Sequence, residues 1–340
     1  MTTTSAASSA QDGSAAAAAP PPPPFDPELA AALAVVAEHI PPVFTLDLLP
    51  SLRGPNSLMP APTDEELSRG GAFEITERRV PGPAGAPDIS LLICRPTGVT
   101  APTAALYNIH GGGMIIGDRR TGLAPTLEWA EELGAAVVSV EYRLAPETPH
   151  PGPVEDCYAG LVWTAAHAGE LGIDQERIVV AGASAGGGLA AAVALLARDR
   201  GGPALAAQLL LCPMLDDRND TPSARQMAGR GVWDRASNEV GWTALLGAAR
   251  GGPDVSPYAA PARATDLSGL PPAFIDVGSA ETFRDEAVTY ASRIWQAGGV
   301  AELHVWPGGF HGFALMAPQA AISRAAAAAP RDWLHRVLAD

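Results

Sequence analysis

The stretch VVAGASAGGGLAAAVALLA, Val179–Ala197, decides the fold class. Small and β-favouring residues lead into a glycine, a serine follows between small neighbours, and an alanine-rich run comes directly after it. The pattern predicts a strand, a tight turn at Ser184 and a helix. The turn matches Gly-x-Ser-x-Gly, in which the glycines remove the clash that larger side chains would cause. We interpret Ser184 as an exposed nucleophile; the alternative is a plain strand-to-helix turn that contains a serine.

A second glycine-rich turn, His110-Gly111-Gly112-Gly113, follows the apolar stretch TAALYNI. Three consecutive glycines let the backbone approach a ligand closely and direct N–H groups toward it. A phosphate-binding loop is disfavoured because no Lys-Ser or Lys-Thr pair follows the glycines. The sequence therefore predicts a loop that stabilises an oxyanion, with a purely structural glycine turn as the alternative.

His311, in GGFHGF, is the candidate general base. It is expected on a short glycine-flanked loop just after the late strand AELHVW, where the side chain is free to reach a serine. Among the other six histidines, His110 begins the glycine loop, where a positioning role is favoured over base catalysis, and His304 is expected inside a strand. The alternative for His311 is an ordinary loop histidine.

The acid that orients the histidine is sought in the stretch IDVGSAETFRDEA. Asp276 is expected within a strand, and Asp285 and Glu286 on the following helix. Glu281 lies in the loop just past the strand, at the sheet edge where the loops after parallel strands converge. We favour Glu281, with Asp285 as the rival. The order serine, acid, histidine along the chain is that of α/β-hydrolases.

Hydrophobic strands alternate with amphipathic helices over most of the chain, which predicts an α/β fold: a mainly parallel central sheet flanked by helices on both faces. The polar stretch at about 216–255, with Trp233 and Trp242, interrupts the alternation and is expected to form a cap or lid. Strands are expected at 73–80, 89–96, 103–110, 135–143, 177–182, 206–215, 272–280 and 301–309, and helices at 121–134, 153–172, 184–202, 283–299 and from 318 onward.

The N-terminal part differs in composition from the rest. Residues 1–24 are rich in Ala, Ser and Pro and are predicted to be a disordered low-complexity tail. Residues 25–70 are predicted to be an N-terminal cap segment, with one helix at 27–39 and a second that begins at the capping box of Thr63. Residues 71–340 form the predicted catalytic domain.

Charge, hydropathy and cysteine content restrict the classes of partner, the cellular location and the cofactors that we expect. The formal net charge of −15 disfavours nucleic acid and anionic membranes as partners. The N-terminus lacks a basic region and no apolar run has the length of a membrane span, so we expect a cytoplasmic protein. Cys94, Cys157 and Cys212 have no metal-like spacing and are predicted to be small buried thiols. We expect neither a cofactor nor a metal.

These segments together resemble the hormone-sensitive-lipase-like (bacterial family IV) esterases of the α/β-hydrolase superfamily. The resemblance runs from about Thr103 to Phe313 and rests on the segments HGGGMIIGD, VEYRLAPETPHPGPVEDCYAGLVW, RIVVAGASAGGGLAA, LLLCPMLD, SPYAAP, LPPAFIDVGSAETFRDEA and GGFHGF. Two positions depart from the family pattern: Ala183 and Glu281 stand where the family usually has Asp.

The resemblance implies an α/β-hydrolase fold with a small helical cap and a cofactor-free serine esterase for short-chain carboxylic esters. It places the nucleophile at Ser184, the base at His311 and the oxyanion donors at the N–H groups of Gly111, Gly112 and Ala185. An amidase or deacetylase with the same triad remains an alternative, and a non-catalytic ligand receptor on this fold a weaker one. A homodimer that pairs through an edge strand is a further expectation.

Overall fold

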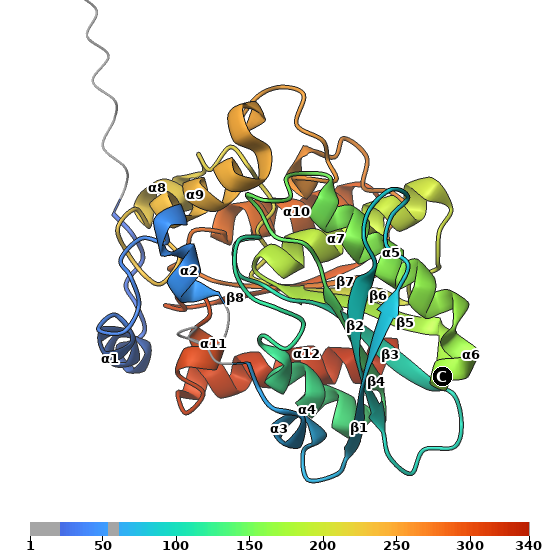
Figure 1. The fold of residues 1–340 in the computed structure, drawn as a ribbon. Coiled ribbons are helices and arrows are strands. Elements are labelled where there is room, and N and C mark those ends of the chain that lie inside the picture. Colours follow the sequence, from blue (N-terminus) through green and yellow to red (C-terminus); the bar gives the residue numbers. More distant parts are fainter. Residues whose placement is uncertain (1–20, 54–60, 340) are drawn as a thin grey trace, which may run out of the picture.

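An eight-stranded sheet, in the order β1-β2-β4-β3-β5-β6-β7-β8, forms the centre of the molecule (Figure 1). β2 runs antiparallel to β1 and β4, and the other neighbouring strands are parallel. The predicted mainly parallel sheet is therefore confirmed. The strands are β1 Phe73–Val80, β2 Ile89–Pro96, β3 Thr103–Ile109, β4 Ala136–Glu141, β5 Ile173–Ala183, β6 Ala207–Leu211, β7 Ala273–Gly278 and β8 Ala301–Trp306.

Helices cover both faces of the sheet, because successive side chains of a strand point to opposite faces. In β2, Leu91 and Ile93 belong to the core beneath α5, α7 and α10, whereas Leu92 and Cys94 belong to the core beneath α4 and α12. The helices are α1 Pro27–Val36, α2 Leu49–Leu52, α3 Asp64–Ser68, α4 Leu123–Leu133, α5 Gly152–Ala166, α6 Ala168–Leu171, α7 Ala185–Arg200, α8 Pro222–Gln226, α9 Arg235–Leu246, α10 Arg284–Gln296, α11 Phe313–Met316 and α12 Ala321–Val337, with 3-10 turns at Leu46–Leu48, Gly247–Ala249 and Pro261–Arg263.

The computed structural model describes residues 21–53 and 61–339, so almost all of the predicted tail, 1–24, lies outside the described residues. Within them no helix has the length and apolarity needed to cross a membrane. Some helix predictions need correction: the expected helix at 27–39 ends at Val36, and that at 283–299 ends at Gln296. The expected helix at 153–172 divides into α5 and α6 at His167, whose imidazole Nδ1 donates to the carbonyl of Trp163 at 2.8 Å. The last helix begins at Ala321, three residues later than expected.

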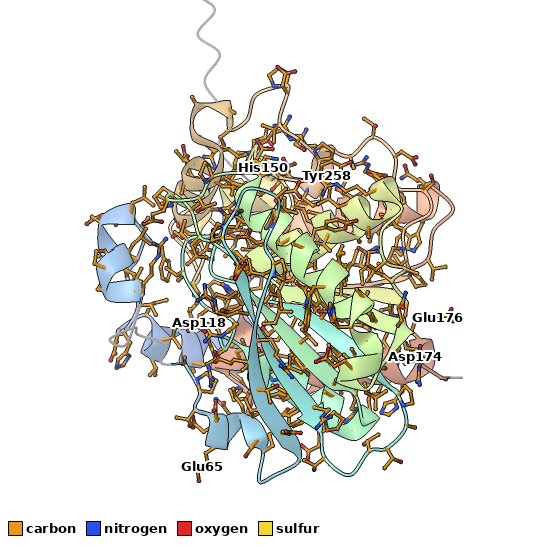
Figure 2. The ribbon with its side chains drawn as sticks, turned by 45° about the vertical axis from the view of Figure 1, so that its right-hand side comes forward. Glu65, Asp118, His150, Asp174, Glu176 and Tyr258 are labelled. Carbon is orange, nitrogen blue, oxygen red and sulfur yellow. The ribbon has the colours of Figure 1, made fainter. Side chains whose placement is uncertain are left out.

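The inserted stretch 216–255 contains α8 and α9 and contacts the N-terminal segment. The rings of Phe44 and Trp233 lie 5.3 Å apart, and the Phe44 N–H donates to Ser237 Oγ. α3, also within the predicted cap segment 25–70, packs instead against β1 and α4. Figure 2 shows Glu65 of α3 at the opposite end of the molecule from His150, whose N–H donates to Leu245 of α9. The two parts of the N-terminal segment therefore have different neighbours.

Candidate active site

Ser184 lies on a sharp turn between β5 and α7. Its backbone has φ 59° and ψ −123°, a conformation that costs a non-glycine residue roughly 1–3 kcal/mol. Close backbone packing requires glycine on both sides: a Cβ at Gly182 would lie 2.3 Å from the Gly186 carbonyl oxygen, and a Cβ at Gly186 only 2.0 Å from that of Ile109. The turn that the sequence predicted is present, and it leaves the Ser184 side chain partly exposed.

His311 lies in the loop between β8 and α11 and contacts both Ser184 and Glu281. Its Nε2 is 2.9 Å from Ser184 Oγ, and its Nδ1 is 2.7 Å from Glu281 Oε1. Phe283 packs edge-on against the imidazole, with ring centroids 5.1 Å apart. Since Glu281 accepts from Nδ1–H, Nε2 is left as the acceptor for the serine hydroxyl. The structure thus brings the three predicted side chains into one hydrogen-bonded chain.

Glu281 is 2% exposed and lies in the turn after β7. Its Oε1 meets His311, and its Oε2 accepts from the Gly278 N–H at 3.1 Å. The rival, Asp285, faces away from His311: it accepts from the Ser223 N–H at 2.8 Å and from Arg284 Nε at 2.8 Å. The longer acid therefore reaches the imidazole from the turn, whereas the first turn of α10 directs Asp285 toward α8.

Two further carboxyl groups of this region are buried without contacting His311. Asp276 accepts from Trp306 Nε1 at 3.0 Å, and burial raises its pKa to about 6. Glu286 accepts from the Leu215 N–H at 2.7 Å, and burial holds its pKa well above the usual range. Neither group is placed to orient the imidazole.

The glycine loop lies beside the Ser184 elbow. A Cβ at Gly111 would lie 3.4 Å from Ser184 Cβ, and Gly112 has φ +111°, which disfavours any other residue. Among the described residues, no acceptor receives the N–H of Gly111, Gly112 or Ala185. Ala185 is the first residue of α7, where backbone N–H groups are free to bind an anion.

His110 contacts the glycine loop rather than Ser184. Its ring stacks on Tyr142 with centroids 4.1 Å apart, and its Nδ1 donates to the Gly111 carbonyl at 2.8 Å. Tyr142 in turn donates its hydroxyl proton to the His110 carbonyl oxygen at 2.9 Å. Burial lowers the pKa of His110, which favours the neutral ring. The sequence did not identify Tyr142, because a tyrosine at a strand end carries no local signal of this contact.

Cys212 departs from the expectation of a small buried thiol. Cys94 and Cys157 are buried, but Cys212 is only partly buried, and its Sγ, a Glu281 carboxylate oxygen and an imidazole nitrogen of His311 all lie within 4.8 Å of one another. Such a donor set is able to hold a metal ion. In this geometry, however, Glu281 and His311 already bind each other. Metal independence stays a prediction.

Comparisons with known proteins agree with this fold. A family model described as alpha/beta hydrolase fold matches residues 106–315. Carboxylesterase NlhH from Mycobacterium tuberculosis is 39% identical over 254 residues, which cover 72% of this chain and 78% of that protein. Ethyl acetate hydrolase from Pseudomonas putida is 32% identical over 216 residues, 63% of this chain and 67% of that protein.

A solved structure titled bacterial heroin esterase superposes with a TM-score of 0.84 and 42% sequence identity, over 93% of this chain and 98% of that one. The family model and the structural superposition agree with the central sheet and flanking helices described above. The chain therefore belongs to the α/β-hydrolase fold family, as its resemblance to the hormone-sensitive-lipase-like esterases predicted.

Proposed function

We propose that this protein is a serine carboxylesterase that hydrolyses short-chain carboxylic esters through an acyl-enzyme intermediate on Ser184. The observation that carries the proposal is the chain of two hydrogen bonds, 2.7 Å from Glu281 to His311 and 2.9 Å from His311 to Ser184. An activated serine needs such a base, held in turn by an acid. The relative named carboxylesterase supports an ester as the substrate. The relative named ethyl acetate hydrolase supports an ester with a short acyl group.

In the first half-reaction, Ser184 Oγ forms a bond with the carbonyl carbon of the ester while its proton passes to His311 Nε2. Glu281 accepts from Nδ1–H and stabilises the imidazolium. The carbonyl oxygen becomes an oxyanion, which receives hydrogen bonds from the N–H groups of Gly111, Gly112 and Ala185. One such donor is worth roughly 3–4 kcal/mol of transition-state stabilisation. The ester C–O bond then breaks, and the alcohol leaves with the proton from His311.

In the second half-reaction, water attacks the acyl carbon and gives a proton to His311 Nε2. The bond to Ser184 breaks, Oγ recovers the proton, and the carboxylic acid is released. No step requires an electron carrier or a co-substrate other than water. Neither a metal nor another cofactor is therefore part of the proposed mechanism.

The test is a rate profile across p-nitrophenyl esters of increasing acyl length, from acetate to palmitate, with p-nitroanilides of the same acids beside them. We expect kcat/KM to be highest for the shortest acids and the anilides to react far more slowly. If the anilides were hydrolysed faster than the esters, the protein would be an amidase. Binding of the esters without hydrolysis would identify it as a receptor. Dialysis against EDTA should leave the ester rate unchanged; a loss that a divalent ion restores would contradict the metal-free mechanism.

A homodimer and a cytoplasmic location are also part of the proposal. β8 ends the sheet, its Val305 is exposed, and Trp295 and Val300 are exposed close to it in sequence, which supports a contact between two copies at this edge. Sedimentation of the purified protein would reveal the dimer, and replacement of Val305 by Lys should dissociate it. The free thiols of Cys94, Cys157 and Cys212 are typical of a reducing compartment.

A further inference from the structure

The residue next to Glu281 is held on two sides by the insertion 216–255. Thr282 is 1% exposed, and its Oγ1 donates to the Trp233 carbonyl at 2.8 Å. Its own carbonyl accepts from Ser223 Oγ at 2.8 Å. Both hydrogen bonds are buried, so losing either would leave a polar group without a partner in a place that water does not easily reach. The position of the Glu281 turn thus depends on the insertion.

The same insertion binds the start of α10, directly after that turn. Ser223 Oγ also accepts from the Asp285 N–H at 3.2 Å, and the Ser223 N–H donates to Asp285 Oδ2 at 2.8 Å. One helical turn along α8, Gln226 Oε1 accepts from Arg284 Nη2 at 2.9 Å. Four consecutive residues, 282–285, therefore include three that hydrogen-bond to α8 or to Trp233.

The ring of Trp233 reaches the other half of the site. Trp233 is 6% exposed, and its six-membered ring lies so close to the glycine loop that a Cβ at Gly113 would be 2.3 Å from Cη2. The indole Nε1–H donates to Asn238 Oδ1 of α9 at 3.3 Å, which sets the plane of the ring. Trp233 thus contacts the acid turn through its carbonyl and the oxyanion loop through its ring.

We propose that Ser223, Thr282 and Trp233 are positioning residues, through which the insertion sets the distance between Glu281 and His311. The inference rests on the proposed function. A glutamate has one more rotatable bond than an aspartate, so its carboxylate is aligned only if the backbone that carries it is held in place. Misplacement of a reacting group by about 1 Å can cost up to about 100-fold in rate. The insertion therefore controls the chemical step through the turn that carries Glu281.

The experiment compares variants that remove one hydroxyl each. Thr282→Val keeps the shape and loses the bond to Trp233, and Thr282→Ser keeps that bond. Ser223→Ala loses the hydroxyl bonds to the Thr282 carbonyl and from the Asp285 N–H, and keeps the backbone bond to Asp285 Oδ2. Ser237→Ala is the matched control, since Ser237 is another buried serine of the insertion whose hydroxyl accepts from Phe44 in the N-terminal segment. Each variant is assayed with p-nitrophenyl acetate for kcat and KM, and its melting temperature is measured.

We expect Thr282→Val and Ser223→Ala to lower kcat by about ten- to a hundredfold with KM nearly unchanged, because the acid acts in the transition state and not on the bound ester. Thr282→Ser should restore most of the loss. Ser237→Ala should lower the melting temperature by a similar amount and leave kcat within about twofold. Equal kcat for all four variants, or an equal loss in Ser237→Ala, would overturn the proposal.

A double-mutant cycle separates this inference from the function on which it rests. Once Glu281→Gln has removed the acid, Thr282→Val should cost no further kcat, since two residues that act through one group are not additive. Additive losses would show a general structural effect and refute the positioning role. If Glu281→Gln alone kept full activity, the assignment of the acid would fail, and the positioning inference with it. An active Thr282→Val beside an inactive Glu281→Gln would overturn only the inference.

Discussion

The Ser184 elbow and the Glu281 turn both follow parallel strands and lie at the two ends of one hydrogen-bonded chain, yet they are held in different ways. At the elbow, backbone packs on backbone, and the glycines at 182 and 186 make this possible. At the acid turn, side chains hold the backbone, and Thr282 binds Ser223, 59 positions away in the sequence. A local steric constraint leaves a short motif in the sequence, whereas a constraint between distant residues leaves none.

The largest effect should come from the elbow. Ser184→Ala removes the proposed nucleophile without adding any atom to the turn, so the fold should persist while kcat falls by about 10⁶-fold, the loss found when subtilisin lacks its serine. The ester assay measures the loss, and the melting temperature confirms the fold. A folded variant within tenfold of the parent would show that the elbow is only a turn.

The acid turn should respond less strongly and more selectively. Glu281→Gln should preserve the fold but lower kcat by about 10⁴-fold, because the imidazole loses the partner that fixes its tautomer. Asp285→Asn disturbs contacts to Ser223 and Arg284 instead, and should cost stability more than rate. Both are measured by kcat and by thermal unfolding. A nearly active Glu281→Gln together with an inactive, folded Asp285→Asn would assign the role to Asp285.

The smallest effect concerns the strand that leads into the acid turn. Burial raises the pKa of Asp276 from 3.8 to about 6, so the folded state binds this proton more tightly than the unfolded state does. The resulting stabilisation, about 3 kcal/mol, is present below about pH 4 and is lost as the pH rises to about 6.

Chemical unfolding at a series of pH values checks this sign. The free energy of unfolding of the parent, relative to that of Asp276→Asn, should fall as the pH rises through this window, because asparagine does not titrate. A difference that is constant with pH, or that rises, would contradict the buried and destabilised carboxylate within β7. The elbow segment Gly-Ala-Ser-Ala-Gly contains no carboxyl group, so this pH dependence belongs to the acid turn and its strand.

Much of the fold was predictable because its signals are local. The alternation of apolar strands and amphipathic helices predicted the sheet and the helices that cover it, and all eight expected strands are present. Some errors lie at element ends, such as the start of the last helix at Ala321. Another lies inside an element, the division of the expected helix 153–172 at His167, where a side-chain contact competes with the helix pattern. The proximity of Cys212 to Glu281 and His311 was also missed, since the three residues come from three different loops.

For the candidate site, the sequence by itself determined the elbow at Ser184 and the glycine loop at 111–113, because each is a run of adjacent residues with one steric requirement. It narrowed the acid to four carboxylates on one stretch and favoured Glu281 over Asp285 by its place in the loop after the strand, but it held no signal of the contacts that each side chain makes. Only the tertiary structure decided where each side chain points. Asp285 accepts a hydrogen bond from Ser223 of α8, and the loop after β8 brings His311 to Glu281. The physical reason is that a hydrogen bond between distant residues depends on how the chain packs, and packing is a property of the whole fold.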